Sequence, residues 1–252
     1  MIKKLKELDN TIINNNIKIK EMEKKEDEEI TFIDLFAGTG AFTHSFEKHN
    51  RFKCVFSNDM VKSSEAIYNL NFPDCNFLLA DLNTIDINDI PSHNILCGGF
   101  PCQPFSIAGE KKGFDDTRSN VFWTILKILK KHSPEVVILE NVKNLKSHDK
   151  GNTYKVIEKE ILKLGYFIKS EILDTSVITN IPQHRERIYI VCFKDENKYD
   201  SFNFDFPVRE NKRIDELLED NISDKYYYTD RFKVYDVIEE GVTQNINENI
   251  LY

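Results

Sequence analysis

Residues 31–42 read TFIDLFAGTGAF, and this stretch sets the interpretation of the whole chain. Its first half, TFIDLF, is a compact apolar run typical of a buried strand. A Gly-x-Gly turn follows, and the apolar spacing of AFTHSFEKH beyond it predicts a helix. Glycines at the end of a strand let a ligand approach the backbone closely. The stretch therefore predicts a strand, a turn able to bind a ligand, and a helix.

The same alternation of strand and helix continues for most of the chain. Short, continuously apolar runs separated by helical segments predict a doubly wound α/β sheet covered by helices on both faces. Ligands of such folds bind outside the carboxyl ends of the strands. The expected strands are residues 31–36, 53–59, 76–81, 93–100, 135–142, 166–173 and 186–193, and the expected helices are 41–49, 61–72, 119–132 and 153–165.

Composition excludes several classes of protein. The chain is 40% hydrophobic and 30% charged, an ordinary balance for a soluble domain. It shows neither an apolar run long enough to cross a membrane nor the apolar core of a signal peptide, so we expect no membrane partner and no secretion. Five cysteines without a CxxC pair argue against a disulfide framework and a zinc site, and the six histidines show no metal-binding spacing. We expect Cys54, Cys97 and Cys192, which lie in strand-like runs, to be buried.

Net charge is −8, which argues mildly against nucleic acid as a partner. Its distribution along the chain is uneven. Residues 95–190 have a net charge of +4, whereas residues 191–252 have −7. Most residues with candidate chemistry lie in the basic middle segment.

Acidic residues follow the expected strands near the glycine turn. Asp59 comes about 20 residues after the turn, where a carboxylate can bind ribose hydroxyls, and Asp81 follows the third expected strand. Either acid alone is more typical of a helix cap or a solvated loop. Thr43 stands where a dinucleotide fingerprint needs its third glycine, which weakens an NAD or FAD interpretation. Asp34 at the strand end suits an adenosine-type cofactor with a cationic tail.

A single cysteine is stiffened by prolines in GGFPCQPFS, residues 98–106. Pro101 and Pro104 fix the backbone on both sides of Cys102, at the expected ligand edge of the sheet. A nucleophilic thiol needs such fixed geometry, but a buried structural cysteine explains the pattern equally well from this stretch alone.

Two further motifs stand at the same expected edge. Glu140 ends the apolar run VVIL, and burial there should raise its pKa and favour the neutral acid. Arg185 and Arg187 alternate with Glu186, so two guanidinium groups should share one face of an extended segment and suit a phosphate or a developing anion. A salt-bridged edge strand is the alternative for this motif.

Together, FIDLFAGTG, Asp59, Asp81, GGFPCQPFS, ENV (140–142) and QHRERIYIV (183–191) resemble the cytosine-5 DNA methyltransferase family, in its bacterial restriction-modification form. The resemblance implies a Rossmann-like, mostly parallel sheet of the S-adenosylmethionine-dependent methyltransferase type. It also implies S-adenosylmethionine as cofactor, with Asp59 on the ribose and Asp81 on the adenine amine. The remaining implied cofactor-binding residues are Phe36, Gly38, Thr39, Gly40, Met60, Leu82 and Phe100.

The resemblance also implies a reaction. Cys102 would attack carbon 6 of a cytosine flipped out of double-stranded DNA, Glu140 would hydrogen-bond the ring, and carbon 5 would take the methyl group. Arg187 would help to hold the base, and Arg185 the DNA backbone or a loop. The implied nucleic-acid contacts are Gln103, Ser106, Lys111, Lys112 and Arg118.

The chain departs from the family at its end, because no target-recognition domain or C-terminal motif is found before Tyr252. We therefore expect a polar N-terminal extension (1–30), a catalytic and cofactor-binding domain (31–195), and a linker with the start of a truncated recognition region (196–252). A second subunit supplying the reader, a fragment inactive alone, and RNA as substrate remain alternatives. The enzyme should act in the cytoplasm or wherever its DNA is held.

Overall fold

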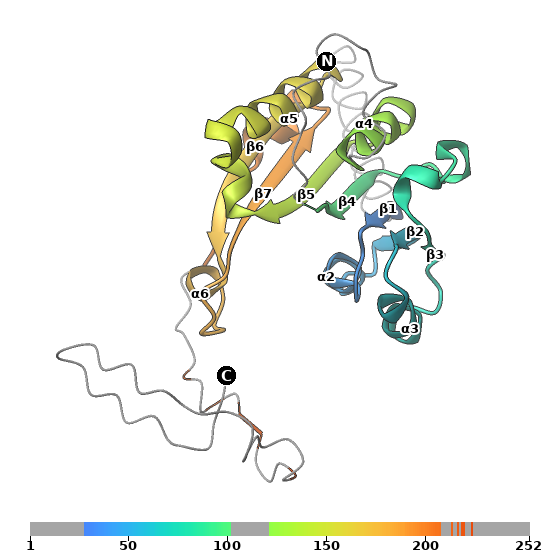
Figure 1. The fold of residues 1–252 in the computed structure, drawn as a ribbon, viewed down its shortest axis with the longest axis vertical. Helices are drawn as coiled ribbons and strands as arrows, with labels where there is room; N and C mark the ends of the chain where they lie inside the picture. The colour runs from blue at the N-terminus through green and yellow to red at the C-terminus, as the bar shows by residue number, and fades with distance from the viewer. Residues whose placement is uncertain are drawn as a thin grey trace, which may run out of the picture.

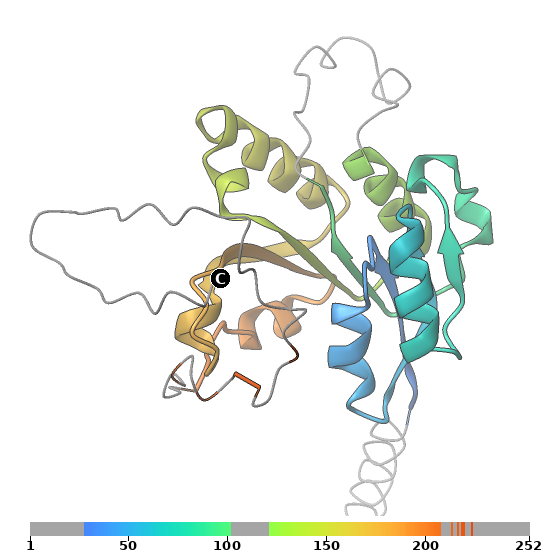
Figure 2. The same ribbon diagram turned by 60° about the horizontal axis from the view of Figure 1, so that its bottom comes forward.

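The computed structural model describes residues 28–101 and 121–207, together with Arg213, Glu216, Leu218, Glu219 and Ser223. These residues form a seven-stranded sheet with helices on both faces (Figures 1 and 2). The strand order is β3-β2-β1-β4-β5-β7-β6. The predicted doubly wound α/β sheet is thereby confirmed.

Each predicted strand is present, with ends that differ from the prediction by at most two residues. The strands are β1 (Ile30–Leu35), β2 (Phe52–Asp59), β3 (Phe77–Leu79), β4 (Ile95–Gly99), β5 (Val136–Val142), β6 (Phe167–Asp174) and β7 (Glu186–Phe193). The helices are α2 (Ala41–Glu47), α3 (Lys62–Asn71), α4 (Val121–His132), α5 (Asn152–Lys163), α6 (Thr175–Ile178) and α7 (Glu196–Ser201). Short 3₁₀ turns are η1 (Leu82–Thr84), η2 (Ile87–Asp89), η4 (Lys143–Lys146) and η5 (His148–Gly151).

Strand direction brings distant parts of the chain to one edge of the sheet. Strands β1 to β5 are parallel, whereas β7 runs antiparallel between β5 and β6. The carboxyl ends of β1 to β6 and the amino end of the reversed β7 therefore lie at the same edge of the sheet, which we call the carboxyl edge. Strand order reverses between β1 and β4, which is where ligands bind in such sheets.

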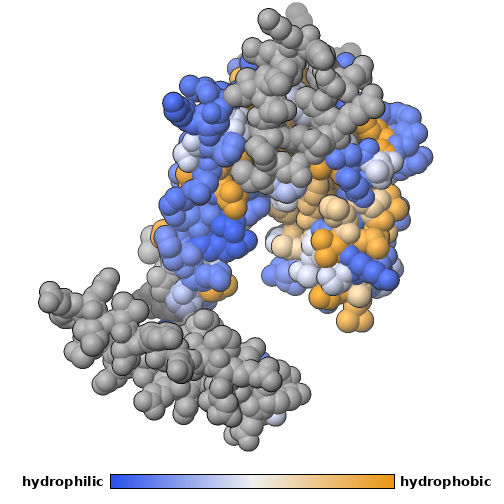
Figure 3. All heavy atoms as spheres, viewed as in Figure 1, coloured by the Kyte–Doolittle hydropathy of each residue, from blue (hydrophilic) through white to orange (hydrophobic). Residues whose placement is uncertain are grey.

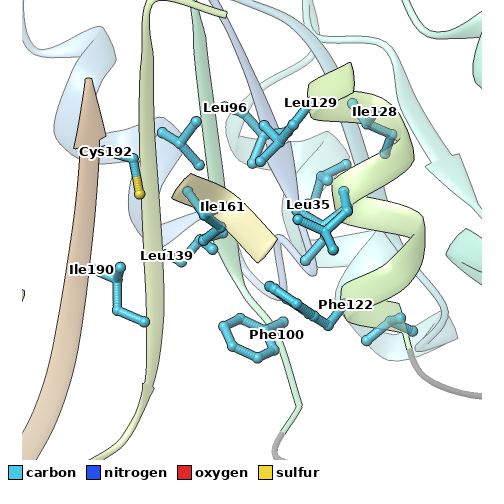
Figure 4. Packing of buried hydrophobic residues seen from close by; sticks show 14 of the residues in the cluster. Leu35, Leu96, Phe100, Phe122, Ile128, Leu129, Leu139, Ile161, Ile190 and Cys192 are labelled. Carbon is cyan, nitrogen blue, oxygen red and sulfur yellow. The ribbon is translucent and has the colours of Figure 1, made fainter. Parts of the chain in front are cut away.

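Alternate residues of the strands pack into two cores on opposite faces. Ile33 and Leu35 of β1 belong to the larger core with α4 and α5, part of which Figure 4 shows, and Phe32 belongs to the smaller core with α2 and α3. Cys54, Cys97 and Cys192 are all buried, as predicted.

The chain stays packed on the sheet beyond β7. Tyr199 of α7 lies 5.5 Å from Phe167, and Phe202 lies 5.2 Å from Phe193, measured between ring centres. Lys169 Nζ also donates to the carbonyl oxygen of Phe202 at 2.5 Å. Packing against β6 and β7 thus reaches past residue 195, the expected end of the domain. Within the described ranges, no helix has both the length and the apolar character needed to span a membrane.

Candidate active site

The turn after β1 adopts a backbone that favours glycine. Gly38 and Gly40 have φ values of 55° and 91°, and Phe36 has a φ of 57°, which is uncommon for a bulky residue. A Cβ on Gly40 would lie 2.2 Å from Cε2 of Phe72, whereas one on Gly38 would meet no atom within 4 Å. Gly40 is therefore needed for packing, while the space beside Gly38 is open.

Asp59, at the end of β2, ties this turn in place. Its Oδ2 accepts from the amide of Gly38 at 2.8 Å, and its Oδ1 accepts from the amide of Val61 at 2.8 Å. The neighbouring Met60 is 69% exposed, so an apolar side chain stands open beside the acid.

The other predicted cofactor residues differ in how far they are exposed. Asp81 and Thr39 are exposed, and Asp81 Oδ1 accepts from the amide of Asn83 at 2.9 Å to cap η1. Leu82 and Phe100 are only 2% and 3% exposed and belong to the larger core. The structure thus brings Phe36, Gly38 and Met60 to the carboxyl edge with accessible atoms, places the largely buried Asp59, 9% exposed, beside them, and packs Leu82 and Phe100 mainly into the interior.

Asp34 does not face the ligand edge, so the expectation that it meets a cationic tail is wrong. Its side chain is fully buried, and its Oδ2 accepts from the Thr43 hydroxyl at 2.8 Å and the Thr43 amide at 3.2 Å. Burial raises the pKa of Asp34 to about 7, against the opposing effect of the Thr43 hydrogen bonds. The Thr43 hydroxyl also lies 2.7 Å from the Tyr68 hydroxyl. Thr43 therefore replaces a fingerprint glycine because it links β1, α2 and α3.

Glu140 is held at the carboxyl edge by its neighbours on both sides. It is opposite Gly99 of β4 and Tyr189 of β7, and its Oε1 lies 3.1 Å from Nε of Arg187. A Cβ on Gly99 would come within 3.4 Å of the Glu140 Oε2, so a glycine there leaves room for the carboxyl group.

Burial raises the pKa of Glu140, as the sequence predicts, while the charges of Arg187 and Arg185 partly offset that rise. Glu140 and Arg187 are still about a quarter exposed, at 22% and 24%. A partly exposed carboxyl group with a raised pKa beside a fixed guanidinium group can exchange a proton and hydrogen-bond a polar ring.

Two buried asparagines that the sequence reasoning missed anchor the loops at this edge. Asn141 Nδ2 donates to the Phe100 carbonyl oxygen at 2.8 Å, and Asn58 Nδ2 donates to the carbonyl oxygens of Leu78 and Ala80 at 2.9 Å. The Phe100–Pro101 amide has no N–H, so this carbonyl contact fixes the chain where it leaves β4. The signal was available, since Asn58 and Asn141 directly adjoin the two acids that the sequence singled out.

Several predicted residues lie outside the described residues, and the structure does not test them. They follow Pro101 and comprise Cys102, Gln103, Ser106, Lys111, Lys112 and Arg118. Among the residues that the structure does describe, no group of three or more histidine, cysteine, aspartate or glutamate side chains is arranged to hold a metal ion.

Solved structures share the fold of this chain. The crystal structure of a Spodoptera frugiperda DNMT2 mutant superposes with a TM-score of 0.62 at 18% identity, covering 79% of this chain and 62% of that one. Identity this low shows the fold alone. The fold is of the S-adenosylmethionine-dependent methyltransferase type.

Sequence comparison defines the family. A family model described as C-5 cytosine-specific DNA methylase matches residues 30–250, and the chain belongs to this family. It is 39% identical over 215 residues to the type II methyltransferase M.Bsp6I of Bacillus sp. (strain RFL6), covering 84% of this chain and 68% of the relative. It is 42% identical over 215 residues to M1.ScrFI of Lactococcus lactis subsp. cremoris, covering 84% and 54%. Across the curated relatives compared, the chain spans between 52% and 68% of their length.

Proposed function

We propose that the chain is the catalytic part of a DNA (cytosine-5-)-methyltransferase that uses Cys102 as its nucleophile. The observation that supports this most directly is the position of Glu140. It lies opposite Gly99, three residues before Cys102, and within 3.1 Å of Arg187. Three motifs far apart in the sequence thereby meet at the carboxyl edge.

The residues around the glycine turn fit S-adenosylmethionine. The open space beside Gly38, the carboxylate of Asp59 and the exposed Met60 match a nucleoside with a diol and a flat base. In this proposal Asp59 holds the ribose, Asp81 holds the adenine amine, and Met60 packs on the ring. The other proposed cofactor contacts are Phe36, Gly38, Thr39, Gly40, Leu82 and Phe100.

The chain's own residues act on the cytosine ring. The Cys102 thiolate bonds to carbon 6, and the electron pair of the carbon 5–carbon 6 double bond moves toward carbon 5. Glu140, as the neutral acid, hydrogen-bonds ring nitrogen 3 and offsets the charge that develops there. When bound, S-adenosylmethionine supplies the methyl group that carbon 5 takes. Loss of the carbon 5 proton then restores the double bond and expels the thiolate. Arg187 holds the Glu140 carboxyl group and helps to hold the base.

In this proposal, recognition of the DNA sequence is the task of other parts of the enzyme. Residues 31–195 form the catalytic domain, and Gln103, Ser106, Lys111, Lys112 and Arg118 contact the DNA near the flipped base. Residues 196–252 connect to a recognition region that is either a further part of a longer chain or a second subunit. The enzyme acts in the compartment that holds the DNA.

A trapped adduct tests the proposal. Fluorine at carbon 5 cannot leave as a proton does, so a duplex with 5-fluorocytosine should stay joined to Cys102 after methyl transfer. We expect an adduct that needs S-adenosylmethionine and resists denaturation, measured as a shifted band on a gel and by mass spectrometry. Cys102→Ser should abolish it while leaving cofactor affinity within about threefold, and Cys75→Ser is the matched control.

Three outcomes would contradict the proposal in different ways. An adduct formed by Cys102→Ser would exclude this nucleophile. Cofactor binding without any adduct, with or without a partner subunit, would indicate a binding subunit. Methyl transfer to transfer RNA but never to duplex DNA would indicate an RNA enzyme.

A further inference from the structure

Two cysteines that the proposed reaction does not use lie side by side in the smaller core. Cys54 belongs to β2, and Cys75 lies in the segment between α3 and β3. The two segments run together, because Ser57 pairs with Phe77 and its amide donates to the Asn76 carbonyl oxygen at 2.9 Å. Cys54 and Cys75 are free thiols, 2% and 8% exposed respectively. Neighbouring segments of the sheet thus hold two buried thiols close together.

One hydroxyl group, that of Tyr68 on α3, contacts both sulfur atoms. It lies 3.6 Å from Sγ of Cys54 and donates to Sγ of Cys75 at 3.4 Å. Sγ of Cys75 also lies 3.6 Å from the hydroxyl oxygen of Ser57. The two thiols are hydrogen-bonded to each other as well. Cysteines whose sulfur atoms are already in contact need little backbone movement to form a disulfide.

The same contacts make the two thiols unequal. The pKa of Cys75 is lowered to about 7, chiefly by the hydrogen bond from Cys54 and also by those from Tyr68 and Ser57, against the effect of burial. The pKa of Cys54 is raised by its hydrogen bond with Cys75 and by burial. Cys75 is also the more exposed of the two. Because the thiolate is the reactive form, Cys75 reacts first with an oxidant, and Cys54 is its protonated partner.

We propose that Cys54 and Cys75 are a redox pair that a hydroperoxide converts into a disulfide, which locks β2 to the segment before β3. The Cys75 thiolate attacks one peroxide oxygen, the O–O bond breaks, and the departing hydroxide takes up a proton to become water. The sulfenic acid formed on Cys75 then condenses with Cys54. The two sulfur atoms bond, and the sulfenic oxygen leaves as water with the Cys54 proton. The sulfur atoms together lose the two electrons that reduce the peroxide.

The lock acts on the two strands that lead to the proposed cofactor-binding acids. Strand β2 ends at Asp59, and Asp81 follows β3. A disulfide reduces the conformational freedom of the unfolded chain, so this one stabilises both strands against unfolding. The inference stands apart from the proposed reaction, since it needs neither DNA nor Cys102.

Peptide mapping of the full chain after treatment with hydrogen peroxide tests the pair. Trypsin together with a protease that cleaves before aspartate releases CVFSN (54–58) and DCNFLLA (74–80), each with a single cysteine. We expect these two peptides to be joined, with the loss of two hydrogens, and to separate on reduction. The thermal midpoint of the oxidised chain should rise by about 5 °C and return to its starting value on reduction.

Cys192→Ala is the matched control. Cys192 is equally buried, in the larger core, and burial raises its pKa. This variant should keep the joined peptides and the reversible rise in midpoint, whereas Cys54→Ala and Cys75→Ala should lose both. The wild-type map needs no substitution, so it decides the matter even where a variant fails to fold.

Two results would overturn the inference. One is an oxidised, folded chain in which the two peptides keep free thiols or are each joined to a different cysteine. The other is a joined pair of peptides without a rise in the thermal midpoint, because such a disulfide would not lock the strands. The adduct test reads Cys102 alone, so its failure would leave the redox pair intact, and the reverse also holds.

Discussion

The carboxyl edge has two halves that use their acids differently. In the turn half, formed by β1, β2 and β3, the carboxylates bind backbone amides: Asp59 holds Gly38 and Val61, and Asp81 holds Asn83. In the charged half, formed by β4, β5 and β7, the carboxylates meet cations, as in Glu140 with Arg187 and Glu186 with Lys143. The turn half therefore has a fixed shape that suits recognition, whereas the charged half can respond when charge develops.

The surface shows the same division. Figure 3 shows the molecule hollowed between the side that carries α6 and the side that carries α2 and α3. The α6 side is mainly hydrophilic, and the α2–α3 side shows large hydrophobic areas. Exposed apolar residues on the latter include Met60 at 69% and Leu70 at 83%. An apolar wall of fixed shape suits a nucleoside cofactor, and a charged wall opposite it suits a polyanionic substrate.

The largest expected effect comes from the charged half. Glu140→Gln replaces a carboxyl group, whose pKa is raised by burial, with an amide that cannot ionise, and it weakens the contact with Arg187 while keeping the shape of the side chain. Methyl transfer should fall by about 10²–10³-fold, the cost of losing one group that stabilises developing charge. Single-turnover transfer of labelled methyl groups to duplex DNA measures it. Transfer within tenfold of the wild type would contradict the role of Glu140.

In the turn half the expected effect is on folding. Gly40→Ala adds a methyl group against the Phe72 ring at a φ of 91°, and should cost about 1–3 kcal/mol of unfolding free energy. Gly38→Ala is the matched control, because its φ is also positive but its Cβ meets no atom within 4 Å. Denaturant unfolding of both variants compares them. Equal losses would show that the Phe72 contact contributes nothing.

Cofactor affinity in the turn half should respond to Asp59. Asp59→Asn places an amide group where one carboxylate oxygen accepts a backbone N–H, so the turn loses an anchor. We expect S-adenosylhomocysteine to bind about tenfold more weakly, as measured by calorimetry, with Asp86→Asn as control. Asp86 caps η2 through Asn88 in the way that Asp81 caps η1. An unchanged affinity for Asp59→Asn would contradict the role of the turn half in cofactor recognition.

The most gradual expected effect concerns Asp34, because it is spread over several pH units. Its folded-state pKa of about 7 is above the usual 3.8, so the folded chain binds more protons than the unfolded chain between these values. Stability from this group is full below about 3.8 and is lost as pH rises through about 7. Asp34→Asn should flatten that decline, which amounts to roughly 4 kcal/mol at about 1.4 kcal/mol per pH unit, seen as thermal midpoints measured from pH 4 to pH 8. A variant with the wild-type pH dependence would contradict this assignment.

The strands could be predicted well because most of them are continuously apolar runs separated by helical segments, and several end near a glycine or an acidic residue. The upward shift of the Glu140 pKa could also be predicted, since the apolar run VVIL before Glu140 indicates burial. Sequence reasoning misplaced Asp34 because the period of a strand does not say which face a helix will cover. Side-chain burial decided that outcome: Thr43 donates two hydrogen bonds to Asp34 Oδ2, while Oδ1 is buried without a hydrogen-bond partner among the described residues.

The small α6 and α7 helices and the 3₁₀ turns escaped prediction for a different reason. The N-caps of α6, α7, η1 and η2 are aspartates, such as Asp174 and Asp195, which sequence alone does not separate from loop residues. The ion pair of Lys143 with Glu186 was also beyond reach, because the two residues meet only after β7 reverses direction and pairs with β5.

Titration of S-adenosylhomocysteine into the wild-type chain, Glu140→Gln and Asp59→Asn tests the division of the edge most directly. It needs no DNA, so the result does not depend on how a DNA sequence is recognised. We expect Glu140→Gln to bind within about threefold of the wild type and Asp59→Asn to bind about tenfold more weakly. A loss of affinity that is the same in both variants would contradict the separation of recognition from chemistry.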